Sequence, residues 1–148
     1  MIARLGICAA FTIALSSCSP PNRLYDTVPF PTLTTMTCTL HAVHTGVLNP
    51  TYYGERATGS MTLVFRDLDP EAHMATIVGN NSSVPVEFRA APTQMQFIET
   101  TAMGSLTVTT VFSPPMAGKP MPAVHSRHIM VAPANVSISQ FAGECTAA

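Results

Sequence analysis

The sequence predicts an all-β fold, a small antiparallel barrel or sandwich of about eight strands, on the strength of three observations. Apolar residues recur at every second position along much of residues 36–148. Clusters rich in Gly, Pro, Asn and Asp, such as "DLDPEA" and "GNNSS", separate these alternating stretches. No apolar stripe with helical spacing continues for more than about two turns. Short strands joined by tight turns satisfy their backbone by pairing with one another, as in small barrels and sandwiches.

The expected strands follow from this alternation. In "TMTCTLHAV", residues 35–43, Met, Cys and Leu occupy one face and Thr the other. In "GSMTLVFRDL", residues 59–68, Met, Leu and Phe share a face. The further strands are expected at residues 73–78, 84–89, 94–99, 105–112, 123–131 and 136–141.

The N-terminus has the features of an export signal. "MIARL" carries one basic residue, and an uncharged apolar run follows to Leu15, too short to span a bilayer. Leu15-Ser16-Ser17-Cys18 resembles the lipobox of bacterial lipoproteins. The resemblance implies that Cys18 receives a diacylglyceryl group and that the preceding peptide is removed. An ordinary cleaved signal that happens to precede a cysteine is the alternative.

The lipobox resemblance also predicts how the chain is divided into segments and in which membrane the protein is anchored. Residues 1–17 are the expected signal peptide, 18–35 the lipidated cysteine with a Pro-rich tether, and 36–148 the β domain. The tether prefers extended conformations and has little reason to pack. Ser19 stands where an Asp would retain enterobacterial lipoproteins at the inner membrane, so the resemblance favours the outer membrane. The expected partners are the membrane, through the lipid, and another envelope protein.

Two cysteines remain after the expected processing. Cys8 leaves with the signal and Cys18 is lipidated, which leaves Cys38 and Cys145 in an oxidising compartment. A disulfide that ties the first strand to the last is the expectation. Two buried thiols, or pairing between molecules, are the alternatives.

Charge and composition exclude some classes of partner. Formal net charge over the whole chain is −1. No cluster of basic residues offers a surface for nucleic acid. The chain has no Trp, which weakens a carbohydrate-stacking interpretation.

A run rich in Met and His suggests copper as an alternative function. Met116, Met121, His128 and Met130 supply thioether and imidazole, which suit copper in oxidising compartments. His128 and Met130 share a strand face, whereas His125 lies on the other. The simpler interpretation predicts no metal site and no cofactor.

The phase of strand 123–131 is a separate prediction. We expect Val124 and Met130 to pack in the core because they are its apolar members at even positions. His125 and Arg127 then face solvent.

No pattern indicates an enzyme. Ser126 lacks a G-x-S-x-G elbow, and its neighbouring His side chains point away from it. The acidic residues of "DLDPEA" suit a solvated turn, and Glu87 and Glu99 each read as a single surface residue.

The overall outline is similar to that of periplasmic lysozyme-inhibitor lipoproteins. Those proteins have a lipobox, a short tether, an eight-stranded barrel and a disulfide that reaches the C-terminal end, and the features expected here are similar in outline, but "ATGSMTL" lacks their S-G-x-x-Y loop. The sequence therefore predicts a lipid-anchored envelope protein that acts as a non-catalytic binding or structural module. Copper binding and lysozyme inhibition are the alternatives.

Overall fold

The computed structural model describes residues 28–49, 51–79, 82–133 and 135–148. This part of the chain contains nine strands and no helix, and therefore no helix long and apolar enough to cross a membrane. The all-β prediction is confirmed. The strands are β1 (Thr35–Asn49), β2 (Thr51–Arg56), β3 (Ser60–Asp69), β4 (Met74–Val78), β5 (Ser83–Ala91), β6 (Gln94–Thr100), β7 (Leu106–Phe112), β8 (Met121–Ala132) and β9 (Asn135–Ala147).

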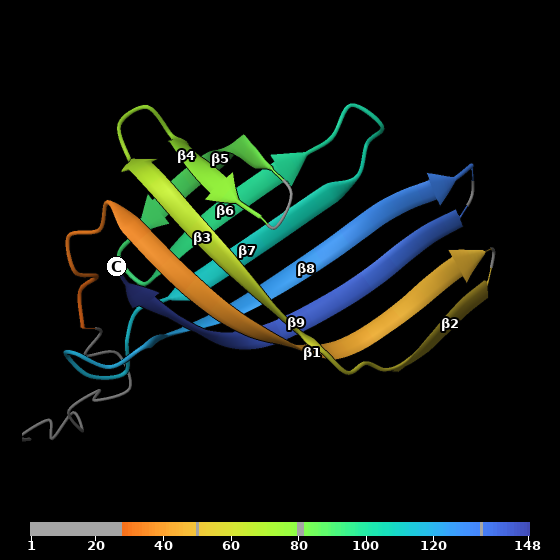
Figure 1. Ribbon diagram of the computed structural model, residues 1–148, viewed down its shortest axis with the longest axis horizontal. Helices are drawn as coiled ribbons and strands as arrows, with labels where there is room; N and C mark the ends of the chain where they lie inside the picture. The colour runs from red at the N-terminus through yellow and green to blue at the C-terminus, as the bar shows by residue number, and fades with distance from the viewer. Residues whose placement is uncertain (1–27, 50, 80–81, 134) are drawn as a thin grey trace, which may run out of the picture.

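Eight of these strands close into an up-and-down barrel (Figure 1). Each strand pairs antiparallel with its neighbours in the order β1-β3-β4-β5-β6-β7-β8-β9, and β9 pairs back with β1. The sequence left barrel and sandwich open. The pairing of β1 with β9 shows that the sheet is a barrel, because closure removes the free edges that a sandwich would keep.

The ninth strand, β2, was not expected, and β1 is longer than predicted. Residues 35–41 of β1 pair with β3, and residues 44–49 pair with β2. The register between β1 and β9 shifts between Ala42 and His44, which marks a bulge. The bulge interrupts the alternation on which the prediction depended, and beyond it β1 exchanges one partner strand for another.

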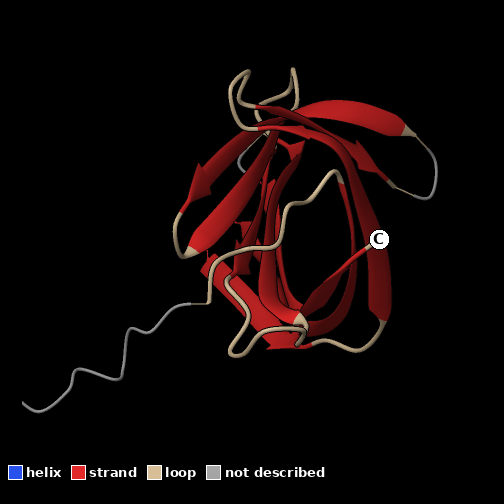
Figure 2. Ribbon diagram, turned by 90° about the vertical axis from the view of Figure 1, so that its left-hand side faces the viewer, coloured by secondary structure: helices blue, strands red, loops and turns tan. Residues whose placement is uncertain are grey.

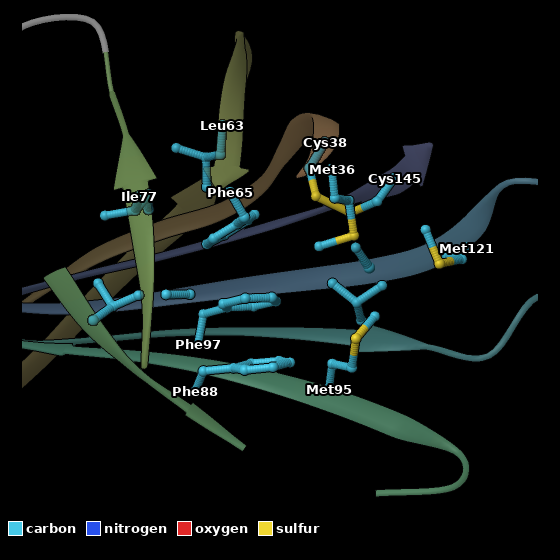
Figure 3. Packing of buried hydrophobic residues seen from close by; sticks show 14 of the residues in the cluster. Met36, Cys38, Leu63, Phe65, Ile77, Phe88, Met95, Phe97, Met121 and Cys145 are labelled. Carbon is cyan, nitrogen blue, oxygen red and sulfur yellow. A yellow bond between two sulfur atoms is a disulfide. The ribbon is translucent and has the colours of Figure 1, made fainter. Parts of the chain in front are cut away.

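A stack of aromatic rings fills the middle of the barrel (Figure 3). The ring of Phe97 lies between those of Phe65 and Phe88, with centroid separations of 3.9 Å and 5.0 Å. All three side chains are almost fully buried. Because each comes from a different strand, the stack joins β3, β5 and β6 across the barrel interior.

Sulfur-containing side chains occupy the neighbouring part of the core. Met36, Met95 and Met121 are buried, and Figure 3 shows Met36 beside a disulfide. That disulfide joins Cys38 to Cys145, the pairing expected from the sequence. The two cysteines lie directly opposite each other on β1 and β9, so the covalent bond crosses the seam at which the barrel closes.

The segment before β1 covers this end of the barrel. Figure 2 looks at the end and shows residues 28–34 running across it as a loop. Phe30 and Leu33 pack against the buried core. The prediction that the Pro-rich tether has little reason to pack is therefore wrong for its last residues, because these two apolar side chains cover the end of the core. Residues 1–27, with the expected signal peptide and the expected lipidation site Cys18, lie outside the described residues.

Candidate binding site in the barrel mouth

The side chains of β8 alternate in the opposite phase to the one predicted. Met121 pairs with Cys145 in the core, and the β8–β9 register runs unbroken to Met130. Odd-numbered residues of β8 therefore point into the barrel as far as Ile129. His125 is 2 % exposed, whereas Val124 and Met130 are 42 % and 43 % exposed. The prediction that the two apolar residues pack inside was wrong, because the pairing of Met121 with Cys145 fixes the phase of β8 and places His125 and Arg127 inside.

A row of three polar residues lies along the inner wall of the barrel, next to the aromatic stack. Glu99 of β6 pairs with Thr107 of β7, which in turn pairs with Arg127 of β8. Paired residues share a face of the sheet, and the face here is the inner one, because Glu99 continues the alternation of the buried Met95 and Phe97. Glu99 is thus an inward residue and not the surface residue that was expected.

These side chains line a cavity of about 440 Å³, which we call the mouth pocket. Glu99, Thr107, His125 and Arg127 form its polar part. Its apolar wall includes Leu63, Ile77, Val84 and Ile129. In Figure 1, β8 runs from the end that residues 28–34 cover toward the opposite end. The mouth pocket therefore lies toward the end of the barrel away from the N-terminal segment.

His125 forms the buried floor of the mouth pocket. A hydrogen bond of 2.8 Å joins its Nδ1 to Oγ1 of Thr109, and its ring meets Phe141 edge-on at 5.8 Å. Burial, and secondarily the positive charge of Arg127, lower the pKa of His125 from 6.5 to about 4. The imidazole is therefore neutral at neutral pH.

Glu99 and Arg127 carry opposite charges, and neither forms a salt bridge with another described residue. Among the described residues the one salt bridge joins Glu87 to Arg89 on the exposed side of β5. Thr107 separates Glu99 from Arg127 in the row, so their backbones are two strand spacings apart, about 10 Å. Both side chains are half-buried, and partly desolvated charges gain from a partner.

A second cavity, of about 670 Å³, lies at the covered end of the barrel. Phe30, Pro114 and Met121 are among its mainly apolar lining, and Lys119 is the one charged residue in the described part of that lining. It is larger than the mouth pocket, but it offers few polar groups to orient a ligand. The mouth pocket therefore has the chemistry that specific recognition needs.

The structure does not bring the proposed copper ligands together. Met121 is buried inside the barrel, whereas Met116 is exposed in the loop before β8. His128 and Met130 share the outer face of β8, as expected from their spacing. Met130 is nine residues further along β8 than Met121, which corresponds to about 30 Å. The described residues also contain no group of three or more His, Cys, Asp or Glu that could hold a metal.

Part of this site could have been found from the sequence. In "QMQFIET", Glu99 follows Met95 and Phe97 at a spacing of two, so the alternation already places it inward. Arg127 stands in the same phase as Met121 and Ala123. The signal was missed because a polar residue in an alternating strand was assigned to solvent, although the mouth of a barrel is lined by polar residues that point inward.

Acid is expected to destabilise the protein through His125. Its folded pKa of about 4 lies below the unfolded value of 6.5, so the unfolded chain binds the proton more readily between these values. The free energy of unfolding should be fully retained above pH 6.5 and fall as the pH drops toward 4. The difference of 2.5 pKa units (6.5 minus 4) corresponds to about 3 kcal/mol. Urea unfolding across this range measures the loss.

His125→Asn should remove this contribution, since an amide can still bond to Thr109 but does not titrate in this range. His128→Asn is the matched control, because His128 lies on the same strand with its side chain outside. The control should keep the wild-type pH dependence. Equal pH dependence in His125→Asn and the wild type would contradict the assignment of His125 as a buried neutral group.

Fold and site together define the chain as an eight-stranded up-and-down β-barrel with a polar pocket inside one end. Comparison with known proteins matches it to no protein family, no curated protein and no solved structure. Barrels of this size serve many unrelated functions, and function lies in the site that a barrel carries, here the mouth pocket.

Proposed function

We propose that the protein is a lipid-anchored envelope lipoprotein that binds a small polar ligand in the mouth pocket. The observation that carries the proposal is the pair of unneutralised charges, Glu99 and Arg127, inside the barrel. Eight-stranded barrels are wide enough to hold one small ligand, and paired strands fix the lining side chains in place. Side chains held in this way bind with little loss of conformational freedom.

The position of the N-terminal segment supports this arrangement. Residues 28–34 cross the end of the barrel opposite the mouth pocket. A lipid attached at Cys18 would tether the barrel by its covered end. The mouth would then face away from the membrane surface, where a soluble ligand can reach it. The outer membrane is the proposed location, by the lipobox resemblance.

The chemistry of the pocket favours binding over catalysis. A general base works best with a pKa near the working pH, and burial lowers the pKa of His125 to about 4. Its Nδ1 already bonds to Thr109, a buried hydroxyl. We therefore assign His125 to the floor of a binding pocket.

Neither alternative function gains a specific observation. The four residues of the copper hypothesis lie on both sides of the barrel wall and in a loop. The likeness to lysozyme inhibitors extends to a barrel and a disulfide that reaches the last strand. That outline is common to unrelated proteins and includes no recognition loop.

Blocking the mouth pocket should abolish ligand binding. Full-length lipoprotein purified in detergent is mixed with the dialysable small-molecule fraction of the cells that produce it, and its Tm is measured. A ligand that binds only the folded state should raise the Tm by several degrees. Thr107→Trp places an indole in the pocket and should remove the shift.

Thr110→Trp on the same strand is the control, since Thr110 points to the outside of the barrel. It should keep the shift. An unchanged shift in Thr107→Trp, or no shift in the wild type, would count against the proposal.

A further inference from the structure

We infer that the ligand of the mouth pocket is a zwitterion, with a cationic group held by Glu99 and an anionic group held by Arg127, and that a short peptide with free ends is the chemical class that fits. This inference rests on the proposed function of the pocket.

The charge balance of the pocket is the first reason. Glu99 and Arg127 are its only ionised lining residues among those described, because His125 is neutral. A purely anionic ligand would satisfy Arg127 but leave Glu99 without a partner, and a cationic ligand would do the reverse. An unpaired, partly buried charge opposes binding. A ligand that carries both charges leaves neither group unmatched.

The spacing of the two groups is the second reason. Glu99 and Arg127 flank Thr107 in one row, about 10 Å apart at the backbone. An extended peptide spans roughly 3.3–3.6 Å per residue, so a tripeptide is about as long as this backbone separation. Amino acids are too short to reach both groups unless the two side chains bend toward each other.

The rest of the lining suits a peptide backbone. Thr107 lies between the two charges, and Thr101 and Ser105 add hydroxyl groups nearby. Thr101 Oγ1 accepts a hydrogen bond from the backbone N–H of Ser105, and Ser105 Oγ accepts one from that of Met130. Each hydroxyl hydrogen is left to donate to a ligand carbonyl. The facing apolar wall contacts the remaining surface of the ligand.

Triglycine with free ends is the probe, because it carries both charges and no side chains. Isothermal titration of the full-length lipoprotein in detergent compares it with N-acetyl-triglycine and with triglycine amide. Each blocked peptide lacks one charge and should bind at least tenfold more weakly. Glu99→Gln should bind free and acetylated triglycine alike, and Arg127→Gln should bind free and amidated triglycine alike.

Glu87→Gln and Arg89→Gln are the matched controls, because they remove the same charges from an exposed pair on the outer face. Both should keep the wild-type preferences. If either blocked peptide binds as tightly as the free one, or if Glu99→Gln still discriminates against acetylation, the zwitterion assignment is wrong. If a pocket variant fails to fold, the affinities of the wild type for the three peptides still test the zwitterion assignment.

Failure of this inference can be told apart from failure of the proposed function. If no triglycine binds but the small-molecule fraction still shifts the Tm in a manner that Thr107→Trp abolishes, the ligand class is wrong and the pocket function stands. If both responses are absent, both proposals fall.

Discussion

Replacing Cys18 by alanine is expected to release the protein from membranes or to leave it unprocessed. In the proposed lipoprotein the lipid is attached through the thiol of this residue, and alanine offers no atom for the lipid. Each buried methylene contributes about 0.8 kcal/mol, so several acyl chains hold a protein far more firmly than one. Membrane fractionation should find wild type in the pellet. Mass spectrometry of the mature N-terminus identifies the lipid.

Cys8→Ala is the control for this substitution, because Cys8 lies within the expected signal peptide. Processing and membrane attachment should be unchanged in that variant. A mature wild-type protein with an unmodified N-terminus at any residue other than Cys18 would disprove the lipoprotein assignment, while the binding test on the mouth pocket would remain applicable to the barrel.

Loss of the disulfide is expected to lower the free energy of unfolding by about 2–5 kcal/mol. Cys38 and Cys145 are 107 positions apart, so their bond restricts a large loop in the unfolded chain. The double variant Cys38→Ala/Cys145→Ala removes the bond without leaving a reactive thiol. Urea unfolding of this variant and of the wild type gives the difference.

Wild type unfolded in the presence of a reductant should resemble the double variant. Digestion under non-reducing conditions should release one peptide pair that contains both cysteines. Two free thiols in protein isolated from the envelope, or equal stability with and without reductant, would contradict the expected role of the bond.

Alternation of side chains was sufficient to predict most of the strands. It failed at β2, where Tyr52 and Tyr53 are adjacent and every residue is exposed, so neither face reads as apolar. It also failed past Ala42, where the bulge adds a residue and reverses the phase of β1. The choice of a barrel required the pairing of β1 with β9, and local sequence carries no information on pairs so far apart.

The candidate site was harder to predict than the fold. Cys38 and Cys145 could be paired because few cysteines remain after the expected processing. Arg127 and Glu99 were assigned to the surface because charged residues are seldom buried. Only the three-dimensional closure of the sheet shows that their strand faces line a cavity and that β6 and β8 lie two spacings apart.

The seam between β1 and β9 also determines when the barrel can be completed. Each strand from β3 to β9 pairs with the next strand along the chain. The seam, in contrast, cannot form until β9 has been synthesised, because it joins β9 to β1. Such non-local pairing gives a high contact order and slow folding. Until then β1 and β8 each present an unpaired edge that can join another chain. A chain truncated before β9 would therefore be an open, aggregation-prone sheet and not a smaller barrel.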